Sequence, residues 1–157
     1  MASEDVKGMA VAVIDHGQVV HVAAYGYANV AEGRALQTDT VMYGASLTKT
    51  AFGYLIMQLV DEGRLDLDRP MYEYLPRPLI EYEGYADLAG DDRWRLLTAR
   101  HVLNHTTGFL NFRWIDDDRR LRFHRDPGAE YGYSAEGFYI LQMVLEDGLG
   151  LDVKEEM

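Results

Sequence analysis

The feature that most constrains this chain is its longest apolar run, residues 51–60 (AFGYLIMQLV). A run of this length predicts a helix, from Ser46 to Glu62, that packs in the protein interior. Ser46 is a good N-cap or first-turn residue, and Gly63 is a good helix terminator. We therefore expect the rest of the chain to be organised around this helix.

Ser46 and Lys49 stand three residues apart at the start of that helix, so their side chains share one face. Free backbone N–H groups at a helix start stabilise negative charge. A lysine in a largely apolar site loses basicity and can accept a serine proton. The spacing predicts a nucleophile beside its base. The alternative is that Ser46 only caps the helix and Lys49 is solvated.

Composition limits the classes of partner and chemistry. With 157 residues the chain forms one domain or part of one. Its net charge of −11 argues against nucleic acid or an anionic membrane surface as partner. The absence of cysteine excludes disulfides, thiol catalysis and cysteine-ligated metals.

The start of the sequence, MASED, is polar and acidic, so the chain as given predicts no signal peptide. No run reaches the roughly 18 apolar residues that span a bilayer. We expect a cytoplasmic protein with no membrane span, or a periplasmic or secreted one if a leader was removed.

The rest of the chain separates into a hairpin region and a mainly helical region, residues 46–146. Residues 8–30 predict a β-hairpin that turns at His16-Gly17. After the apolar helix we expect an extended connector over 64–70, a helical turn at 71–75 and a surface loop over 79–93. Thr98 is the expected cap of a helix that begins at Ala99.

Two groups of polar residues resemble metal sites only superficially. His101 and His105 lie four residues apart, but the glutamate of H-E-x-x-H and a third ligand are missing. Asp116-Asp117-Asp118 lacks the glycine and the ligand spacing of a calcium loop. We therefore predict structural histidines, a solvated acidic loop, and neither metal nor cofactor.

Tyr133 lies on a predicted loop just before a helix that runs to about Leu145, with Ser134 as its expected cap. A phenol there can point into a cleft. A phenolate beside a buried lysine can shuttle protons, because each stabilises the ionised form of the other. With eleven tyrosines in the chain, a core or surface role is the alternative.

Five segments in order resemble the N-terminal part of the serine β-lactamase and penicillin-binding-protein superfamily. The resemblance is greatest to class C β-lactamase-like esterases and D-aminopeptidases. It covers nearly all of residues 8–146. The segments are GMAVAVIDHGQVVHVAAYGYAN, YGASLTK, EGRLDLDRPMYEYLP, TARHVLNHTTGF and DPGAEYGYSAEGFYILQ.

This resemblance implies roles for individual residues. Ser46 would form an acyl-enzyme, Lys49 would be its general base, and Tyr133 would match the tyrosine of the family's Tyr-x-Asn motif. Ser134 and Ala135 would be substrate-binding positions. The Ser46 N–H would supply one oxyanion donor, and the segment from His105 to Gly108 would be structural.

Two departures from the family pattern affect these expectations. Ala135 replaces the asparagine of Tyr-x-Asn, which argues against β-lactam turnover and fits an esterase-like member better. The later Lys-Thr-Gly or His-x-Gly motif is missing, since the only lysine after Tyr133 is Lys154. Asp152 and Glu155 instead predict a capping box that opens a new helix.

The implied fold is α+β, a five-stranded antiparallel sheet packed on helices, of which we expect only the first two strands. A two-stranded hairpin alone is marginally stable in water. We therefore expect an incomplete domain over residues 1–157: a truncated module, a fragment that a second chain or self-association completes, or a short homologue.

Three functions follow from this reading. The first is hydrolysis of ester, amide or β-lactam bonds in small molecules through an acyl-enzyme. The second is binding of acyl or β-lactam compounds without turnover. The third is a non-catalytic module whose hairpin edge pairs with a partner strand.

Overall fold

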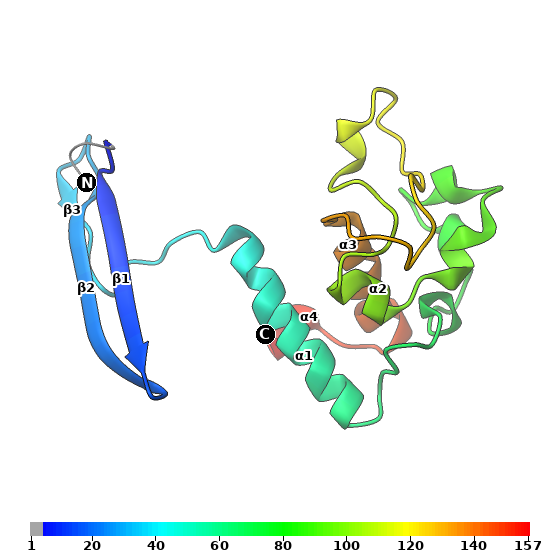
Figure 1. The fold of residues 1–157 in the computed structure, drawn as a ribbon, viewed down its shortest axis with the longest axis horizontal. Coiled ribbons are helices and arrows are strands. Elements are labelled where there is room, and N and C mark those ends of the chain that lie inside the picture. Colours follow the sequence, from blue (N-terminus) through cyan, green and yellow to red (C-terminus); the bar gives the residue numbers. More distant parts are fainter. Residues whose placement is uncertain (1–4) are drawn as a thin grey trace. The chain divides into compact units, whose positions relative to one another are not determined.

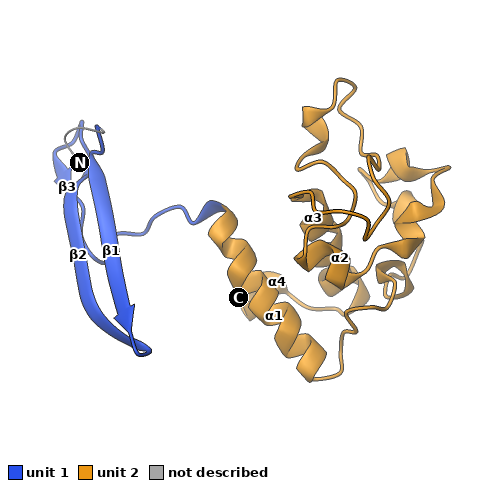
Figure 2. Cartoon of the chain, in the orientation of Figure 1, with its two compact units in different colours: residues 1–45 blue, residues 46–157 orange. Residues whose placement is uncertain are grey.

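A computed structural model describes residues 5–157 of the chain (Figure 1). The chain forms two compact units, residues 1–45 and residues 46–157, which are coloured separately in Figure 2. Each unit is described below by itself. In the part of the chain that the structure describes, no helix has the length and apolar character needed to cross a membrane.

The first unit is an antiparallel sheet with strand order β1-β2-β3. Strands β1 (Gly8–Asp15) and β2 (Gln18–Asn29) form the predicted hairpin. His16 and Gly17 both have positive φ, 47° and 76°, as the two central residues of a type I′ turn require.

Strand β2 ends at Asn29, within the predicted hairpin region, and a third strand was not predicted. Gly26 has φ +78°, and a Cβ there would lie 2.1 Å from the Lys7 carbonyl oxygen. The glycine therefore permits a close backbone approach within the sheet. Strand β3 (Arg34–Ala35) pairs with the end of β2. A strand of two residues is too short to show the alternation of apolar and polar residues that would predict it.

The second unit contains the predicted apolar helix as α1 (Thr48–Asp61). It starts later than predicted: Ser46 belongs to a 3-10 turn (Ala45–Leu47), the N-cap position is Leu47, and no side chain caps the helix. Ser46 is therefore not an N-cap. Gly63, with φ +71°, ends the helix as expected, its N–H donating to the Val60 carbonyl at 3.0 Å.

Only one face of α1 is buried. Phe52, Leu55, Ile56 and Leu59 face the core, whereas Tyr54 and Met57 are 69% and 47% exposed. The continuous apolar run suggested burial on all sides, which the structure does not show.

Residues 79–93 are not the surface loop that the sequence indicated. Three 3-10 turns (Leu79–Glu81, Ala86–Leu88 and Asp92–Leu96) cover this region. Their buried apolar residues join the core. Each of these short turns directs only one or two side chains into the core. Its sequence therefore lacks the apolar periodicity by which helices and strands are predicted. The preceding turn, Met71–Glu73, matches the prediction.

Three short helices complete the second unit. Thr98 caps α2 (Ala99–Leu103) as predicted, its Oγ1 accepting from the His101 N–H at 3.3 Å. Helix α3 (Glu136–Met143) continues into a π-helical turn, Val144–Gly148. Asp152 caps α4 (Val153–Glu156) through the Lys154 N–H at 3.0 Å, which confirms the predicted helix start.

The core of this unit joins these helices and the 3-10 turns. Its least exposed side chains include Ile56, Leu97, Val102, Phe109, Ile140 and Leu141. The apolar helix α1 thus shares one core with the later segments of the unit, including Val153 of α4. This agrees with the expectation that the rest of the chain is organised around it.

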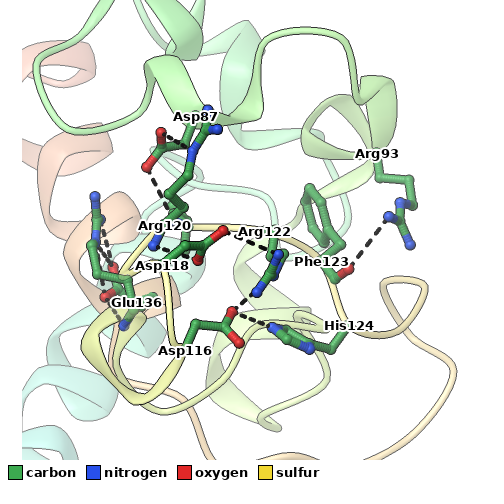
Figure 3. Close-up of polar contacts among 11 residues, drawn as sticks. Asp87, Arg93, Asp116, Asp118, Arg120, Arg122, Phe123, His124 and Glu136 are labelled. Atoms are coloured by element: carbon green, nitrogen blue, oxygen red, sulfur yellow. Dashed lines mark hydrogen bonds and ion pairs between the residues drawn. The ribbon is translucent and has the colours of Figure 1, made fainter.

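The acidic cluster at 116–118 is solvated only in part. Asp117 and Asp118 are exposed, but the Asp116 carboxylate is 14% exposed and pairs with Arg122 at 2.9 Å and His124 at 2.8 Å (Figure 3). The guanidinium of Arg122 holds the pKa of Asp116 below its usual range. The Asp116 carboxylate therefore links the loop at residues 116–118 to the segment at residues 122–124.

Candidate active site

Ser46 and Lys49 meet at the start of α1, on the face that the spacing predicted. Lys49 Nζ donates to Ser46 Oγ at 3.2 Å. Ser46 is exposed and Lys49 is half-buried. Ala45, directly before the serine, has φ +45°, a left-handed conformation that a residue with a Cβ rarely adopts. Such strained residues cluster at functional sites.

Tyr133 reaches the same place from the loop before α3, far along the sequence. Its side chain is 37% exposed, and Lys49 Nζ lies 5.4 Å from its ring centroid. Hydrogen bonding to Ser46, and then to Lys49, lowers the pKa of the Tyr133 phenol, while burial opposes this shift. The structure therefore brings Ser46, Lys49 and Tyr133 together.

Phe138, on the first turn of α3, forms a second aromatic wall of this cluster. Lys49 Nζ lies 5.4 Å from its ring centroid. The lysine is thus held beside two aromatic faces, which attract its ammonium group. The contact between Lys49 and Phe138 was not predicted, because a phenylalanine in an apolar helical pattern indicates only an ordinary core residue.

Ser134 and Ala135 lie next to the cluster but face the protein interior. Their exposed fractions are 1% and 4%. Ser134 Oγ donates to the Leu110 carbonyl at 2.9 Å, so Ser134 is not the helix cap that we expected. Neither side chain is open to solvent, and their substrate-binding role stays a prediction.

One segment, residues 105–113, holds the Tyr133 loop in position. The Gly132 N–H donates to the His105 carbonyl at 2.7 Å, and the Ala135 N–H donates to the Asn111 carbonyl at 3.0 Å. Backbone hydrogen bonds of this kind cannot be predicted from the sequence, because they do not depend on the side chains of the residues that form them. The sequence indicated only that His105 to Gly108 is structural.

Glu136, the first residue of α3, adds a buried ion pair to this attachment. Its carboxylate is 2% exposed and accepts from the Arg113 guanidinium at 2.6 Å and from the Arg113 N–H at 2.8 Å (Figure 3 labels Glu136). Burial of a carboxylate requires such a complete set of partners. The sequence alone indicates no role for either residue.

The two histidines of the sequence pattern have separate environments. His105 packs its ring against Tyr133, with centroids 4.3 Å apart. His101 lies on α2, and a Cβ at Gly128 would approach its Nε2 to 3.1 Å. Within residues 5–157, no group of three or more histidine, aspartate or glutamate side chains is arranged to hold a metal ion.

Comparison with known proteins matches the whole chain, residues 1–157, to the Beta-lactamase family. Two curated relatives are Esterase EstB from Burkholderia gladioli and Penicillin-binding protein 4 from Amycolatopsis lactamdurans. EstB is 33% identical over 103 residues, 64% of this chain and 24% of EstB. Penicillin-binding protein 4 is 31% identical over 154 residues, 90% of this chain and 38% of that protein.

The fold has solved counterparts as well. The octameric penicillin-binding protein homologue from Pyrococcus abyssi superposes with a TM-score of 0.75 at 23% identity. The match covers 99% of this chain and 38% of that one. The fold is therefore α+β and β-lactamase-like, although residues 5–157 supply only three strands.

The chain spans 24% and 38% of the lengths of the two curated relatives. The family match nonetheless extends along its entire length, and it agrees with the motifs that the sequence displays. The chain belongs to the Beta-lactamase family.

Proposed function

We propose that this chain carries the nucleophilic part of a serine hydrolase that cleaves ester or amide bonds through an acyl-enzyme. The observation that carries the proposal is the 3.2 Å contact between Lys49 Nζ and Ser46 Oγ, with the Tyr133 phenol beside both. A nucleophile within hydrogen-bond reach of its base is the arrangement that covalent catalysis requires.

In the proposed reaction, Lys49 as a neutral amine removes the Ser46 hydroxyl proton, and Oγ attacks the substrate carbonyl carbon. The Ser46 N–H stabilises the negative oxygen of the tetrahedral intermediate. Tyr133 donates its phenolic proton to the leaving group, and the Lys49 ammonium returns a proton to Tyr133. Water then cleaves the acyl ester and regenerates Ser46.

Esters are the better candidate substrates. Ala135 supplies no amide to hold a β-lactam side chain, and its methyl group is buried. One relative is named an esterase and another a penicillin-binding protein, so both compound classes belong in the test.

The test is steady-state hydrolysis of an activated short-chain ester and of a chromogenic penicillin. We expect ester turnover that falls at least about 1,000-fold in Ser46→Ala, since the nucleophile is lost. Thr48→Ala, which removes an exposed hydroxyl from the same stretch, is the matched control and should keep its activity. Ester turnover that survives in Ser46→Ala would refute the proposal, as would acylation without turnover.

We also propose that a strand from another chain, or from a second copy of this one, pairs with the hairpin edge. Strand β1 has a neighbour on one side only among the described strands. An unpaired edge exposes N–H and C=O groups that can accept another strand.

A further inference from the structure

His105 has an unusual place beside the cluster. It follows α2 with φ +58°, in the left-handed region that few residues with a Cβ adopt. Its ring centroid lies 4.3 Å from that of Tyr133, 5.4 Å from that of Phe138 and 5.9 Å from that of Tyr131. The imidazole therefore packs directly against the tyrosine that the proposed mechanism uses.

His105 also bonds to the residues on both sides of Tyr133. Its carbonyl oxygen accepts from the Gly132 N–H at 2.7 Å, and its Nδ1 accepts from the Ser134 N–H at 3.2 Å. An imidazole nitrogen that accepts from an amide carries no proton. The arrangement thus requires a neutral ring whose proton is on Nε2.

We propose that His105 is a positioning residue for Tyr133, and that acyl transfer at Ser46 requires its neutral imidazole. The kinetic half of this inference rests on the proposed function. The structural half concerns only how the Tyr133 loop is held.

Protonation of His105 would act on this loop in two ways. A hydrogen on Nδ1 would face the Ser134 N–H and abolish that hydrogen bond. It would also add a second positive charge near Lys49, the charged group that faces His105 from α1. The loop before α3 contributes the phenols of Tyr131 and Tyr133, and α3 contributes the uncharged Phe138 ring.

The surroundings of His105 already favour the neutral ring. Burial makes the largest contribution and lowers the pKa of His105 below its usual value of about 6.5. The positive charge of Lys49 acts in the same direction, and the backbone hydrogen bond with Ser134 opposes both. The Nδ1 contact is therefore intact at neutral pH and is lost only in acid.

The kinetic test compares Ser46 acylation by an activated ester in wild type and in His105→Asn between about pH 4 and about pH 8. Asparagine tolerates positive φ and can accept from the Ser134 N–H, but it cannot titrate. Below the pKa of His105, the logarithm of the wild-type rate should fall with pH more steeply than that of His105→Asn, by an additional slope of about one. His105→Asn should lack this additional slope, and its rate at about pH 8 should be about tenfold lower because the ring contact is lost.

His124→Asn is the control, because His124 pairs with Asp116. It removes a second histidine from the same unit, and it should keep the wild-type slope. A slope in His105→Asn equal to that of wild type would overturn the kinetic half.

Two measurements on the resting protein keep the inference testable without acylation. Imidazole ¹⁵N NMR of the wild type should show His105 neutral at neutral pH with its proton on Nε2. The Tyr133 phenol should titrate at higher pH in His105→Asn than in wild type, because the loop no longer holds it against Ser46 and Lys49. A proton on Nδ1, or an unchanged Tyr133 titration in folded His105→Asn, would overturn the positioning role.

The failures of the two proposals can be told apart. A wild type that forms no acyl-enzyme refutes the proposed function and the kinetic half together. The NMR and phenol titrations still decide whether His105 positions Tyr133.

Discussion

At the scale of single residues, Ser46 and Lys49 lower the pKa of the Tyr133 phenol. Hydrogen bonding to Ser46 makes the largest contribution that lowers the Tyr133 pKa. Ser46→Ala removes this bond, so the Tyr133 pKa should rise toward the usual value of about 10. Because the chain has eleven tyrosines, the measurement is an ultraviolet titration of each protein against its own Tyr133→Phe variant. A Tyr133 pKa that does not change in Ser46→Ala would contradict the proposed contact.

The buried Glu136–Arg113 pair belongs to the same scale and makes a prediction about stability. Glu136→Gln leaves the Arg113 guanidinium without its charge partner, and we expect a loss of about 3 kcal/mol in the free energy of unfolding. Urea denaturation measures this loss. Asp68→Asn breaks the exposed pair with Arg100, at 2.6 Å, and should cost much less. Equal losses of unfolding free energy in Glu136→Gln and Asp68→Asn would contradict this prediction, because they would show that burial of the ion pair does not determine its contribution to stability.

At the scale of elements, the features that the sequence predicted are those with local signals. The His16-Gly17 turn, the Thr98 cap and the Gly63 terminator each depend on the conformational preference of one or two residues. The 3-10 turns between residues 79 and 96 were missed because tertiary burial, rather than periodicity, holds them. The predicted start of α1 was too early, because Ser46 lies in a 3-10 turn and does not cap the helix.

Helix glycines offer a prediction in which two effects oppose each other. In a helix, Gly→Ala usually stabilises by up to about 1 kcal/mol. At Gly137 on α3, a Cβ would lie 2.7 Å from Thr107 Cγ2, so packing outweighs propensity. We expect Gly137→Ala to lower the unfolding free energy by about 1–3 kcal/mol. Thermal and urea unfolding check this.

Gly53 on α1 is the matched control. Its nearest contact would be Leu103 Cδ2 at 3.9 Å, an ordinary distance. Gly53→Ala should therefore stabilise the protein. Stabilisation by Gly137→Ala as well would contradict the close packing of α3 against Thr107.

At the scale of the whole molecule, the hairpin unit carries many exposed apolar side chains. Ile14, Val19 and Val20 are 67%, 62% and 59% exposed. Such surfaces promote association. We expect the protein to self-associate with rising concentration in sedimentation velocity experiments, and Ile14→Lys to lower the associated fraction. His21→Lys adds a similar charge without removing an apolar group and serves as the control. A monomer at every concentration would contradict self-association through the hairpin.

The sequence predicted which side chains meet at the candidate site better than it predicted the contacts that hold them there. The Ser-x-x-Lys spacing and the resemblance around Tyr133 identified three side chains that the structure brings together. The contacts that hold them involve the His105 ring, the Asn111 carbonyl and the Arg113 side chain, across long stretches of chain. No local pattern encodes such contacts, because any polar residue or backbone group can make them.

The central claim is that Ser46 is a working nucleophile, and intact mass spectrometry tests it most directly. The protein is incubated with an activated short-chain ester and, separately, with a fluorescent penicillin, in parallel with Ser46→Ala. The account predicts an acyl adduct on the wild type that maps to Ser46 and is missing in Ser46→Ala. A folded wild type that neither forms an adduct with nor turns over either reagent, or an adduct that persists in Ser46→Ala, would contradict it.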